Sequence, residues 1–158
     1  MNILPTVLFL CTGNFYRSRY AEAWFNHEAP KQGLLWRAES RGFRPHLVTL
    51  PLSHHAAERL ASQSVPRILT RHKPERVLES DFDGASLIVA LYEPEHRPMM
   101  QEQFPVWSDR ILYWQVPDIE EVPPLIALAR IESEVAALIQ QLQSKQDSGG
   151  KIGIGMEF

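Results

Sequence analysis

The chain has 158 residues, of which 44% are apolar and 22% are charged, a balance typical of one globular domain with its own hydrophobic core. Its net charge of −3 gives no overall attraction to nucleic acid or to an anionic membrane, and no run has transmembrane length or the pattern of a secretory signal. One cysteine excludes an internal disulfide framework and a zinc site of several cysteines, so we expect a cytoplasmic protein.

The first predicted strand runs directly into a predicted helix. The apolar run from Val7 to Leu10 predicts the strand, and apolar residues at three- and four-residue spacing predict a helix from about Arg17 to Glu28. The residues from Cys11 to Ser18 therefore form a strand-to-helix turn. At such a turn the first backbone N–H groups of the helix have no partner within the helix, and the helix dipole adds partial positive charge. The sequence thus predicts an anion site at this turn.

The side chains of this turn are those that hydrolysis of a phosphate ester requires. A thiolate on Cys11 would attack phosphorus, and the guanidinium of Arg17 would hold two phosphate oxygens. We expect Cys11 to be ionised near neutral pH, because the helix N-terminus, Arg17 and the Ser18 hydroxyl lower a thiol pKa from about 8.5 to roughly 3.5–7.5. The predicted phosphate-binding residues are Thr12, Gly13, Asn14, Phe15, Tyr16 and Ser18.

Three residues of the turn have an expected backbone role. Gly13 and Asn14 tolerate the left-handed angles that a loop needs to turn successive N–H groups toward one ligand, and Ser18 is a candidate helix cap. The Gly-Lys-Ser/Thr end of a nucleotide-binding loop is absent from the sequence, so neither nucleotide nor Mg²⁺ is implied. The alternative for Cys11 is a small buried hydrophobic residue at the end of a strand.

The strand and turn together resemble the signature of the low-molecular-weight protein tyrosine phosphatases, in which Cys, Gly, Asn, Arg and Ser hold these relative places. The resemblance covers about residues 6 to 145 and is closest in the first loop. It implies hydrolysis of phosphotyrosine in proteins, and of aryl phosphomonoesters, through a phosphocysteine intermediate on Cys11 without metal or cofactor. The implied partners are a tyrosine-phosphorylated protein, such as a kinase, and inorganic phosphate or another oxyanion in the loop. Neither nucleic acid nor a membrane is expected.

The next strand is predicted from Leu34 to Ser40. The loop that follows would lie beside the mouth of the site, where the resemblance implies aromatic or apolar groups that select the substrate. Phe43, His46 and Leu47 are the candidates for this substrate wall. The alternative is that Phe43 and Leu47 are loop residues packed into the core.

The remaining apolar patterns complete an α/β order. Further helices are predicted at residues 51–63, 74–79, 94–103 and 124–145, further strands at residues 87–91 and 110–116, and a turn at residues 80–84. This order favours a single-domain doubly wound parallel sheet of about four strands with helices on both faces, whose ligand lies beyond the carboxyl ends of the strands. We expect residues 1–146 to form this phosphatase-like domain and residues 147–158 to form a flexible glycine-rich tail.

A carboxylic acid opposite the nucleophile would let the leaving oxygen depart in neutral form. The resemblance implies an aspartate after the fourth strand. Asp118 occupies that place, although Ile119 stands where the family commonly has proline. We expect Asp118 to protonate the leaving oxygen and then to activate the water that hydrolyses phospho-Cys11. The alternatives are a turn or capping role for Asp118, or the same chemistry from Glu120 or Glu121.

Departures from the family pattern leave two other functions open. Tyr16 stands where many members have a second cysteine, and Arg41 and Ile119 also differ from the usual residues. One alternative is a phospho-ligand-binding module of the same fold with weak catalysis. The other is an arsenate reductase, which would need an external thiol because the chain has one cysteine.

Overall fold

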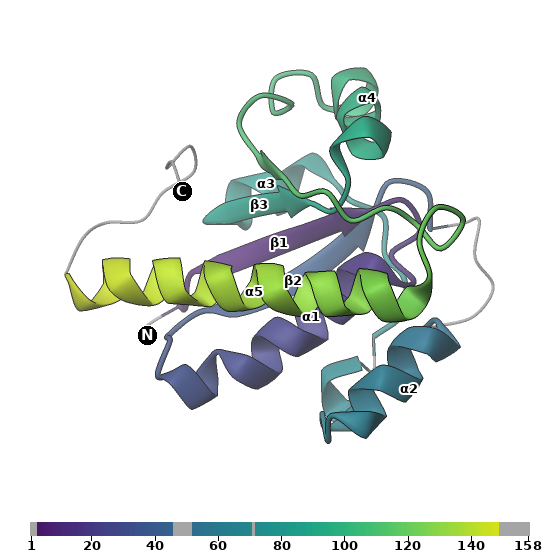
Figure 1. Cartoon of the computed structure of the whole chain (residues 1–158). Helices are drawn as coiled ribbons and strands as arrows, with labels where there is room; N and C mark the ends of the chain where they lie inside the picture. The colour runs from purple at the N-terminus through teal and green to yellow at the C-terminus, as the bar shows by residue number, and fades with distance from the viewer. Residues whose placement is uncertain (1–2, 46–51, 71, 149–158) are drawn as a thin grey trace.

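A sheet of four parallel strands forms the centre of the molecule. The computed structural model describes residues 3–45, 52–70 and 72–148. The strands are β1 (Thr6–Cys11), β2 (Arg37–Gly42), β3 (Leu87–Ala90) and β4 (Leu112–Tyr113), in the order β2-β1-β3-β4 (Figure 1). β1 is flanked on both sides, because Leu8 lies beside Glu39 of β2 and beside Ile88 of β3. The chain therefore leaves the sheet at Cys11 between two neighbouring strands.

Alternate residues of β1 face two separate cores. Val7 and Phe9 belong to a core that α1 (Arg17–Glu28) and α5 (Pro124–Asp147) cover. Leu8 and Leu10 belong to a second core, to which α3 (Glu79–Gly84) and α4 (Glu93–Gln103) contribute. The remaining helical elements are α2 (His54–Ser62), which contacts α1, and the short 3₁₀-helices η1 (Pro30–Gln32) and η3 (Arg67–Thr70). Packing on both faces of the sheet confirms the predicted doubly wound α/β fold.

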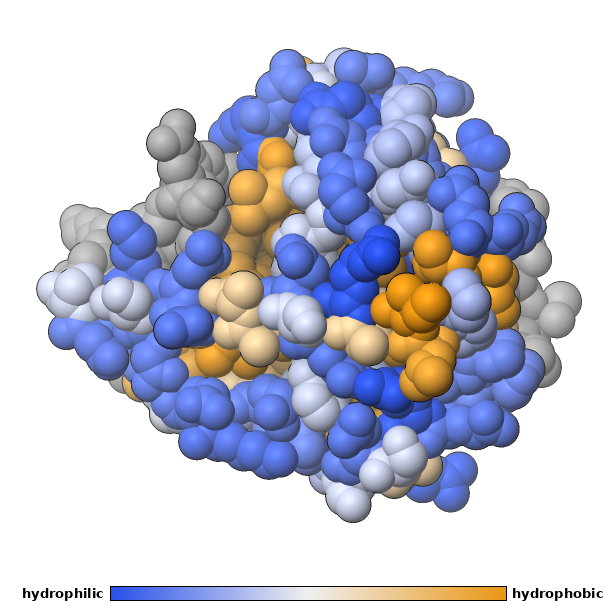
Figure 2. Space-filling model, in the orientation of Figure 1, coloured by the Kyte–Doolittle hydropathy of each residue, from blue (hydrophilic) through white to orange (hydrophobic). Residues whose placement is uncertain are grey.

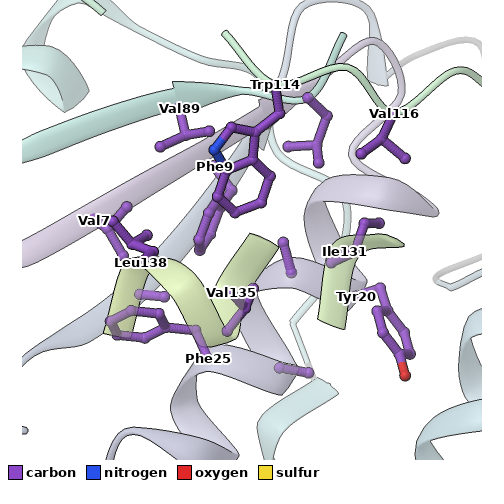
Figure 3. Close-up of a cluster of buried hydrophobic side chains, with 14 of the residues drawn as sticks. Val7, Phe9, Tyr20, Phe25, Val89, Trp114, Val116, Ile131, Val135 and Leu138 are labelled. Atoms are coloured by element: carbon purple, nitrogen blue, oxygen red, sulfur yellow. The ribbon is translucent and has the colours of Figure 1, made fainter. Parts of the chain in front are cut away.

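The core on the α1 side holds the long C-terminal helix against the sheet (Figure 3). Phe9 packs edge-on to Phe25 at a ring-centroid distance of 6.2 Å and tilts against Trp114 at 5.4 Å. The predicted apolar stripe of α5 is buried and consists of Leu128, Ile131, Val135, Leu138, Ile139 and Leu142. Full burial of a side chain of this size stabilises a fold by about 1.5–3 kcal/mol. The sheet from which the site projects is thus held rigidly by apolar packing.

Two local predictions between residues 74 and 84 are wrong. Residues 74–78 of the helix predicted at residues 74–79 form an extended segment instead, because the Gly42 N–H donates to Glu75 O at 2.8 Å and the Val77 N–H donates to Gly42 O at 2.9 Å. The predicted turn at residues 80–84 belongs to α3 instead. Pairing with the end of β2 therefore outweighs the local preference of this segment for a helix.

Other elements exist as predicted with different bounds. The second strand begins at Arg37 rather than at Leu34, and regular pairing in the fourth strand is confined to Leu112–Tyr113. The helix predicted at residues 94–103 begins one residue earlier, at Glu93. The type of each of these elements is therefore confirmed, while the ends depend on pairing across the sheet.

The C-terminal helix reaches further than predicted. α5 extends to Asp147, so the predicted tail does not begin at that residue. Residues 149–158 lie outside the described residues, and the domain boundary stays a prediction. Across the described ranges, no helix is both long and apolar enough to cross a membrane.

Candidate active site

The predicted site lies at the carboxyl edge of the sheet. Cys11 is the last residue of β1, pairs with Gly42 of β2 and is only 2% exposed. The chain then passes through the loop from Thr12 to Tyr16 and enters α1 at Arg17. The end of a central strand with neighbours on both sides is where a doubly wound fold binds its ligand.

The loop holds backbone donors without protein partners. In the part of the chain that the structure describes, no backbone N–H from Thr12 to Tyr16 donates to another protein group. Tyr16 is the N-cap residue of α1, and no side chain of the described residues caps the helix. Unpartnered donors at a helix N-terminus form an anion site. Ser18 lies inside the first turn of α1, so its predicted capping role is wrong.

A hydroxyl contacts the sulfur of Cys11. Cys11 Sγ lies 2.9 Å from Ser18 Oγ, and Asn14 Nδ2 donates to the same hydroxyl oxygen at 3.0 Å. The Ser18 hydroxyl can therefore direct its hydrogen to the sulfur. A hydrogen bond donated to sulfur stabilises its anionic form, which is the reactive one.

Asn14 sets the shape of the loop. Its φ of 50° lies in the left-handed region, as predicted. Among the glycines of the described chain, only Gly33 has a positive φ. The prediction of a left-handed conformation for Gly13 is therefore wrong. The fully buried Asn14 side chain donates to Ser40 Oγ at 2.8 Å and accepts from the Glu75 N–H at 2.9 Å. These bonds hold a backbone conformation that most side chains disfavour.

Phe15 and Tyr16 complete the loop in different environments. Phe15 is half-buried against the α1-side core, and its carbonyl accepts from the Ser53 N–H at 2.9 Å, which connects the loop to the start of α2. Tyr16 is buried, and within the described ranges its hydroxyl has no hydrogen-bond partner. Burial, together with the charge of Asp118, raises the pKa of Tyr16 to about 12. Tyr16 therefore keeps its proton at neutral pH.

An ion pair extends the Asn14 network toward the surface. Ser40 Oγ donates to Glu22, and the same carboxylate lies 2.8 Å from His72 Nε2. The hydrogen bond to Glu22 raises the pKa of His72 above its ordinary value, against the effect of burial. His72 thus supports the loop from behind and does not contact Cys11.

Replacing His72 by glutamine should destabilise the protein at acidic pH only. Because folding raises the pKa of His72, the protonated imidazole stabilises the folded state at pH values below the unfolded pKa of 6.5. This contribution is lost as the pH rises through the folded pKa. Glutamine can keep a hydrogen bond to Glu22 without titrating. By urea denaturation we expect the free energy of unfolding to fall by about 1 kcal/mol near pH 5.5 and the difference to vanish near pH 8. An equal difference at both pH values would argue against the charged pair.

Gly42 gives the loop its room. A Cβ at Gly42 would lie 2.8 Å from Asn14 N and 2.9 Å from Thr12 O. Both are backbone atoms, so relief requires the loop itself to move. The close approach of β2 to the loop therefore depends on glycine at this position.

The variant Gly42→Ala should lower both stability and anion binding. We expect a loss of about 1–3 kcal/mol in the free energy of unfolding and weaker binding of inorganic phosphate, because the loop must shift. Gly84→Ala is the matched control, since no atom of the described residues lies within 4 Å of a Cβ there. Thermal denaturation and calorimetry measure both effects, and equal behaviour of the two variants would speak against the close packing.

Arg17 is a buried cation at the edge of the loop. Its side chain is 2% exposed, with Nη1 donating to Val116 O at 3.0 Å and Nη2 donating to Glu95 Oε2 at 2.7 Å. Burial alone would lower the pKa of Arg17, but the negative charges of Cys11 and Glu95 raise it overall. Among the described residues, Arg17 Nε has no hydrogen-bond partner. That N–H is left for an oxygen of a bound ligand.

Asp118 lies beside Arg17. Its Oδ2 is 3.5 Å from Arg17 Nη2, and 43% of its side chain is exposed. Glu121 instead accepts a hydrogen bond from the Tyr92 hydroxyl at 3.0 Å, and Glu120 is exposed. Of Asp118, Glu120 and Glu121, Asp118 is the one that lies beside Arg17.

The predicted substrate wall needs correction. Phe43 is fully buried and stacks on His96 at a ring-centroid distance of 5.8 Å, so it is a core residue, which was the alternative reading of the sequence. His46 and Leu47 lie outside the described residues. Figure 2 shows an apolar patch over the start of α5. The exposed apolar side chains of this region are Ile119, Leu125 and Ile126.

Sequence reasoning missed Glu95. Its Oε2 accepts hydrogen bonds from Arg17 Nη2 and from the Thr12 hydroxyl, and it lies 3.1 Å from His96 Nε2. Although burial opposes it, the hydrogen bonds from His96 and Arg17 hold the pKa of Glu95 well below its usual range. A signal was present in the sequence: Glu95 follows β3, and the carboxyl ends of parallel strands meet at one edge of a sheet.

These groups together suit a tetrahedral oxyanion. The loop offers unpartnered N–H groups and the Nε of Arg17, with the Cys11 sulfur at its base and the Asp118 carboxyl beside it. Within residues 3–45, 52–70 and 72–148, no group of three or more His, Cys, Asp or Glu side chains is arranged to hold a metal ion. The arrangement can bind a phosphate-like group over a sulfur nucleophile and exchange a proton with it.

Comparisons with known sequences agree with this geometry. A family model described as low molecular weight phosphotyrosine protein phosphatase matches residues 6–116. The protein-arginine-phosphatase of Bacillus subtilis (strain 168) is 30% identical over 107 residues, which cover 66% of this chain and 67% of that protein.

Solved structures share the fold over nearly the whole chain. The low molecular weight protein tyrosine phosphatase from T. tengcongensis is 28% identical, with a TM-score of 0.71 over 89% of this chain and 99% of that chain. YfkJ from Bacillus subtilis is 23% identical, with a TM-score of 0.80 over 91% of this chain and 98% of that chain. At the latter identity the likeness concerns the fold alone.

Proposed function

Because the chain belongs to the low molecular weight phosphotyrosine protein phosphatase family, we propose that it hydrolyses phosphorylated side chains of proteins through a phosphocysteine on Cys11. One observation carries the proposal: Cys11 Sγ lies 2.9 Å from Ser18 Oγ at the base of a loop whose backbone donors have no protein partner in the described chain. A sulfur nucleophile and an oxyanion cradle therefore share one site.

The first step transfers the phosphoryl group to sulfur. The Cys11 thiolate attacks phosphorus, an S–P bond forms and the bond to the leaving oxygen breaks. Backbone N–H groups of the loop and Arg17 Nε hold the phosphoryl oxygens in the transition state. Asp118 donates its proton to the leaving oxygen, which departs in neutral form.

The second step frees the enzyme. The Asp118 carboxylate takes a proton from a water molecule, whose oxygen attacks phosphorus. The S–P bond breaks, the Cys11 thiolate is restored, and inorganic phosphate leaves. The half-exposed carboxyl of Asp118 beside Arg17 supports this proposed role in both steps, because solvent can reach it.

Phosphotyrosine in a protein is the proposed substrate. The family description supports it, and the exposed Ile119 and Leu125 offer apolar surface to an aromatic ring and its flanking residues. A tyrosine-phosphorylated protein is accordingly the proposed partner. The proposed setting is the reducing cytoplasm, where the single cysteine stays a thiol.

Phosphoarginine is the second candidate. The relative with 30% identity is a protein-arginine-phosphatase. In this chain the carboxylates of Glu95 and Asp118 lie 2.7 Å and 3.5 Å from Arg17 Nη2. Carboxylates near the leaving group would suit a substrate that carries a guanidinium there.

Paired peptides decide between these functions. Two peptides of one sequence, carrying phosphotyrosine or phosphoarginine at the same position, are assayed for phosphate release without metal. The proposal expects the higher kcat/KM for phosphotyrosine, and a preference for phosphoarginine would favour the second candidate. Tight binding without turnover would indicate a phospho-ligand-binding module, and arsenate-dependent oxidation of an external thiol would indicate an arsenate reductase.

A further inference from the structure

We propose that Glu95 is a resident anion of the phosphate site, which shares the Arg17 guanidinium with bound phosphate and thereby keeps the affinity for phosphate low. The inference rests on the proposed function, because it concerns the ligand and product of the same site. Glu95 acts through Arg17 and is therefore a positioning residue. Its consequence for turnover is faster release of inorganic phosphate.

The contacts of Glu95 place a carboxylate at the cradle itself. Oε2 lies 2.7 Å from Arg17 Nη2, and the hydroxyl of Thr12, the first residue of the loop, donates to the same oxygen. The Glu95 side chain is 24% exposed, so solvent screens this charge only in part. A phosphate that binds Arg17 Nε must therefore lie close to this negative charge.

The imidazole of His96, which lies beside Glu95, does not neutralise the negative charge of the carboxylate. His96 Nδ1 accepts from the Tyr92 N–H at 2.9 Å, so Nε2 carries the imidazole hydrogen and donates it to Glu95. Burial lowers the pKa of His96, which keeps the imidazole neutral. His96 thus orients the carboxylate and adds no positive charge.

A second carboxylate, that of Asp118, also lies near the guanidinium of Arg17. Asp118 Oδ2 lies 3.5 Å from Arg17 Nη2. One guanidinium therefore faces two carboxylates before phosphate, which is itself an anion, binds. Like charges that share one guanidinium in a partly buried site repel one another and therefore oppose the binding of phosphate. The backbone N–H groups still hold the oxyanion, but Glu95 sets how tightly.

The position of Glu95 on α4 makes this arrangement stable without ligand. Glu95 lies in the first turn of α4, where the helix dipole favours a negative charge. The carboxylate is therefore held by α4 and His96 as well as by Arg17. Phosphate can bind Arg17 Nε without removing Glu95 from its other partners.

The variant Glu95→Gln tests the inference, because it keeps the shape and a hydrogen-bond acceptor while removing the charge. Titration calorimetry with inorganic phosphate at pH 7.5 needs no turnover. We expect the Kd for phosphate to fall about fivefold or more. Glu93→Gln is the matched control, because this carboxylate occupies the same first turn of α4 but pairs with Arg97 at 2.8 Å. Its Kd should stay within about twofold of the wild type.

The outcomes separate this inference from the proposed function. A Kd for Glu95→Gln equal to or higher than that of the wild type would overturn the inference, even if the wild type is an active phosphatase. Tighter phosphate binding in a protein without phosphatase activity would support the inference and contradict the proposed function. Glu95→Ala is the second variant and should also bind phosphate more tightly. Loss of folding in both variants would assign Glu95 a structural role and likewise overturn the inference.

Product inhibition in steady-state assays gives a second test of the effect of Glu95 on phosphate binding. The inhibition constant of inorganic phosphate as product should fall in Glu95→Gln in parallel with the calorimetric Kd, while Glu93→Gln leaves it unchanged. A merely structural defect would change kcat and stability without tightening product binding. An unchanged inhibition constant beside a normal kcat would count against the inference.

Discussion

Replacing Cys11 by serine should abolish hydrolysis of p-nitrophenyl phosphate and reduce kcat by at least about a thousandfold. A neutral hydroxyl is a much weaker nucleophile than a thiolate, and among the described residues the side chain within hydrogen-bond reach of Cys11 is Ser18, which is not a base. Initial rates are measured across pH 5 to 8 without metal, for both proteins at equal concentration.

Folding and ligand binding provide the control for this variant. Serine has the shape of cysteine and is smaller, so it fits without a clash, and Cys11→Ser should keep its thermal midpoint and still bind inorganic phosphate through the loop N–H groups and Arg17. A residual kcat above about one-hundredth of the wild-type value would mean that another group is the nucleophile.

Replacing Asp118 by asparagine should slow poor leaving groups far more than good ones. Proton donation contributes about 10²–10⁴-fold where the leaving oxygen is basic, as in phenyl phosphate, and much less for p-nitrophenyl phosphate, whose leaving group departs readily as an anion. The ratio of kcat values for the two substrates, compared between wild type and variant, measures this difference.

Glu120→Gln is the matched control for Asp118. It removes a carboxylate two residues along the same loop that is exposed and that no ion pair ties to Arg17 in the described chain. Its effect on either substrate should be small. If Asp118→Asn lowered kcat equally for both substrates, Asp118 would not be the general acid. Its role would then be to orient Arg17.

The fold could be predicted because its elements carry strong local patterns. The apolar run of β1 and the stripe of α5 are both long enough to indicate their structure without knowledge of their partners. The segment at residues 74–78 could not be predicted in this way. It is extended because its backbone pairs with Gly42, a residue distant in the sequence.

The part of the site that lies in one continuous turn could be predicted from the sequence, whereas the residues that come from distant segments could not be predicted from spacing. The residues from Cys11 to Ser18 share one turn, so their spacing already indicates an anion site. Asp118 depended on the family resemblance, and the structure places it beside Arg17. Phe43 shows the limit, because a loop phenylalanine that faces the site and one that packs in the core look alike in sequence.

Glu95 is a residue of the site that spacing in the sequence does not reveal. Its distance from Arg17 in the sequence hides the contact between them, and only the meeting of β1 and β3 in the sheet brings α4 to the loop. A pattern of residue types cannot show which of several acids after β3 turns toward the site. The contact between Glu95 and Arg17 therefore follows from the assembled sheet and not from residue types.

Trapping the covalent intermediate is the most direct measurement of the central claim. The protein is mixed with an aryl phosphate, quenched in acid within milliseconds, digested and analysed by mass spectrometry. We predict one phosphoryl group on the peptide that contains Cys11, absent in Cys11→Ser and lost as turnover ends. Turnover without phosphate on Cys11, or with phosphate on another residue, would contradict the phosphocysteine mechanism.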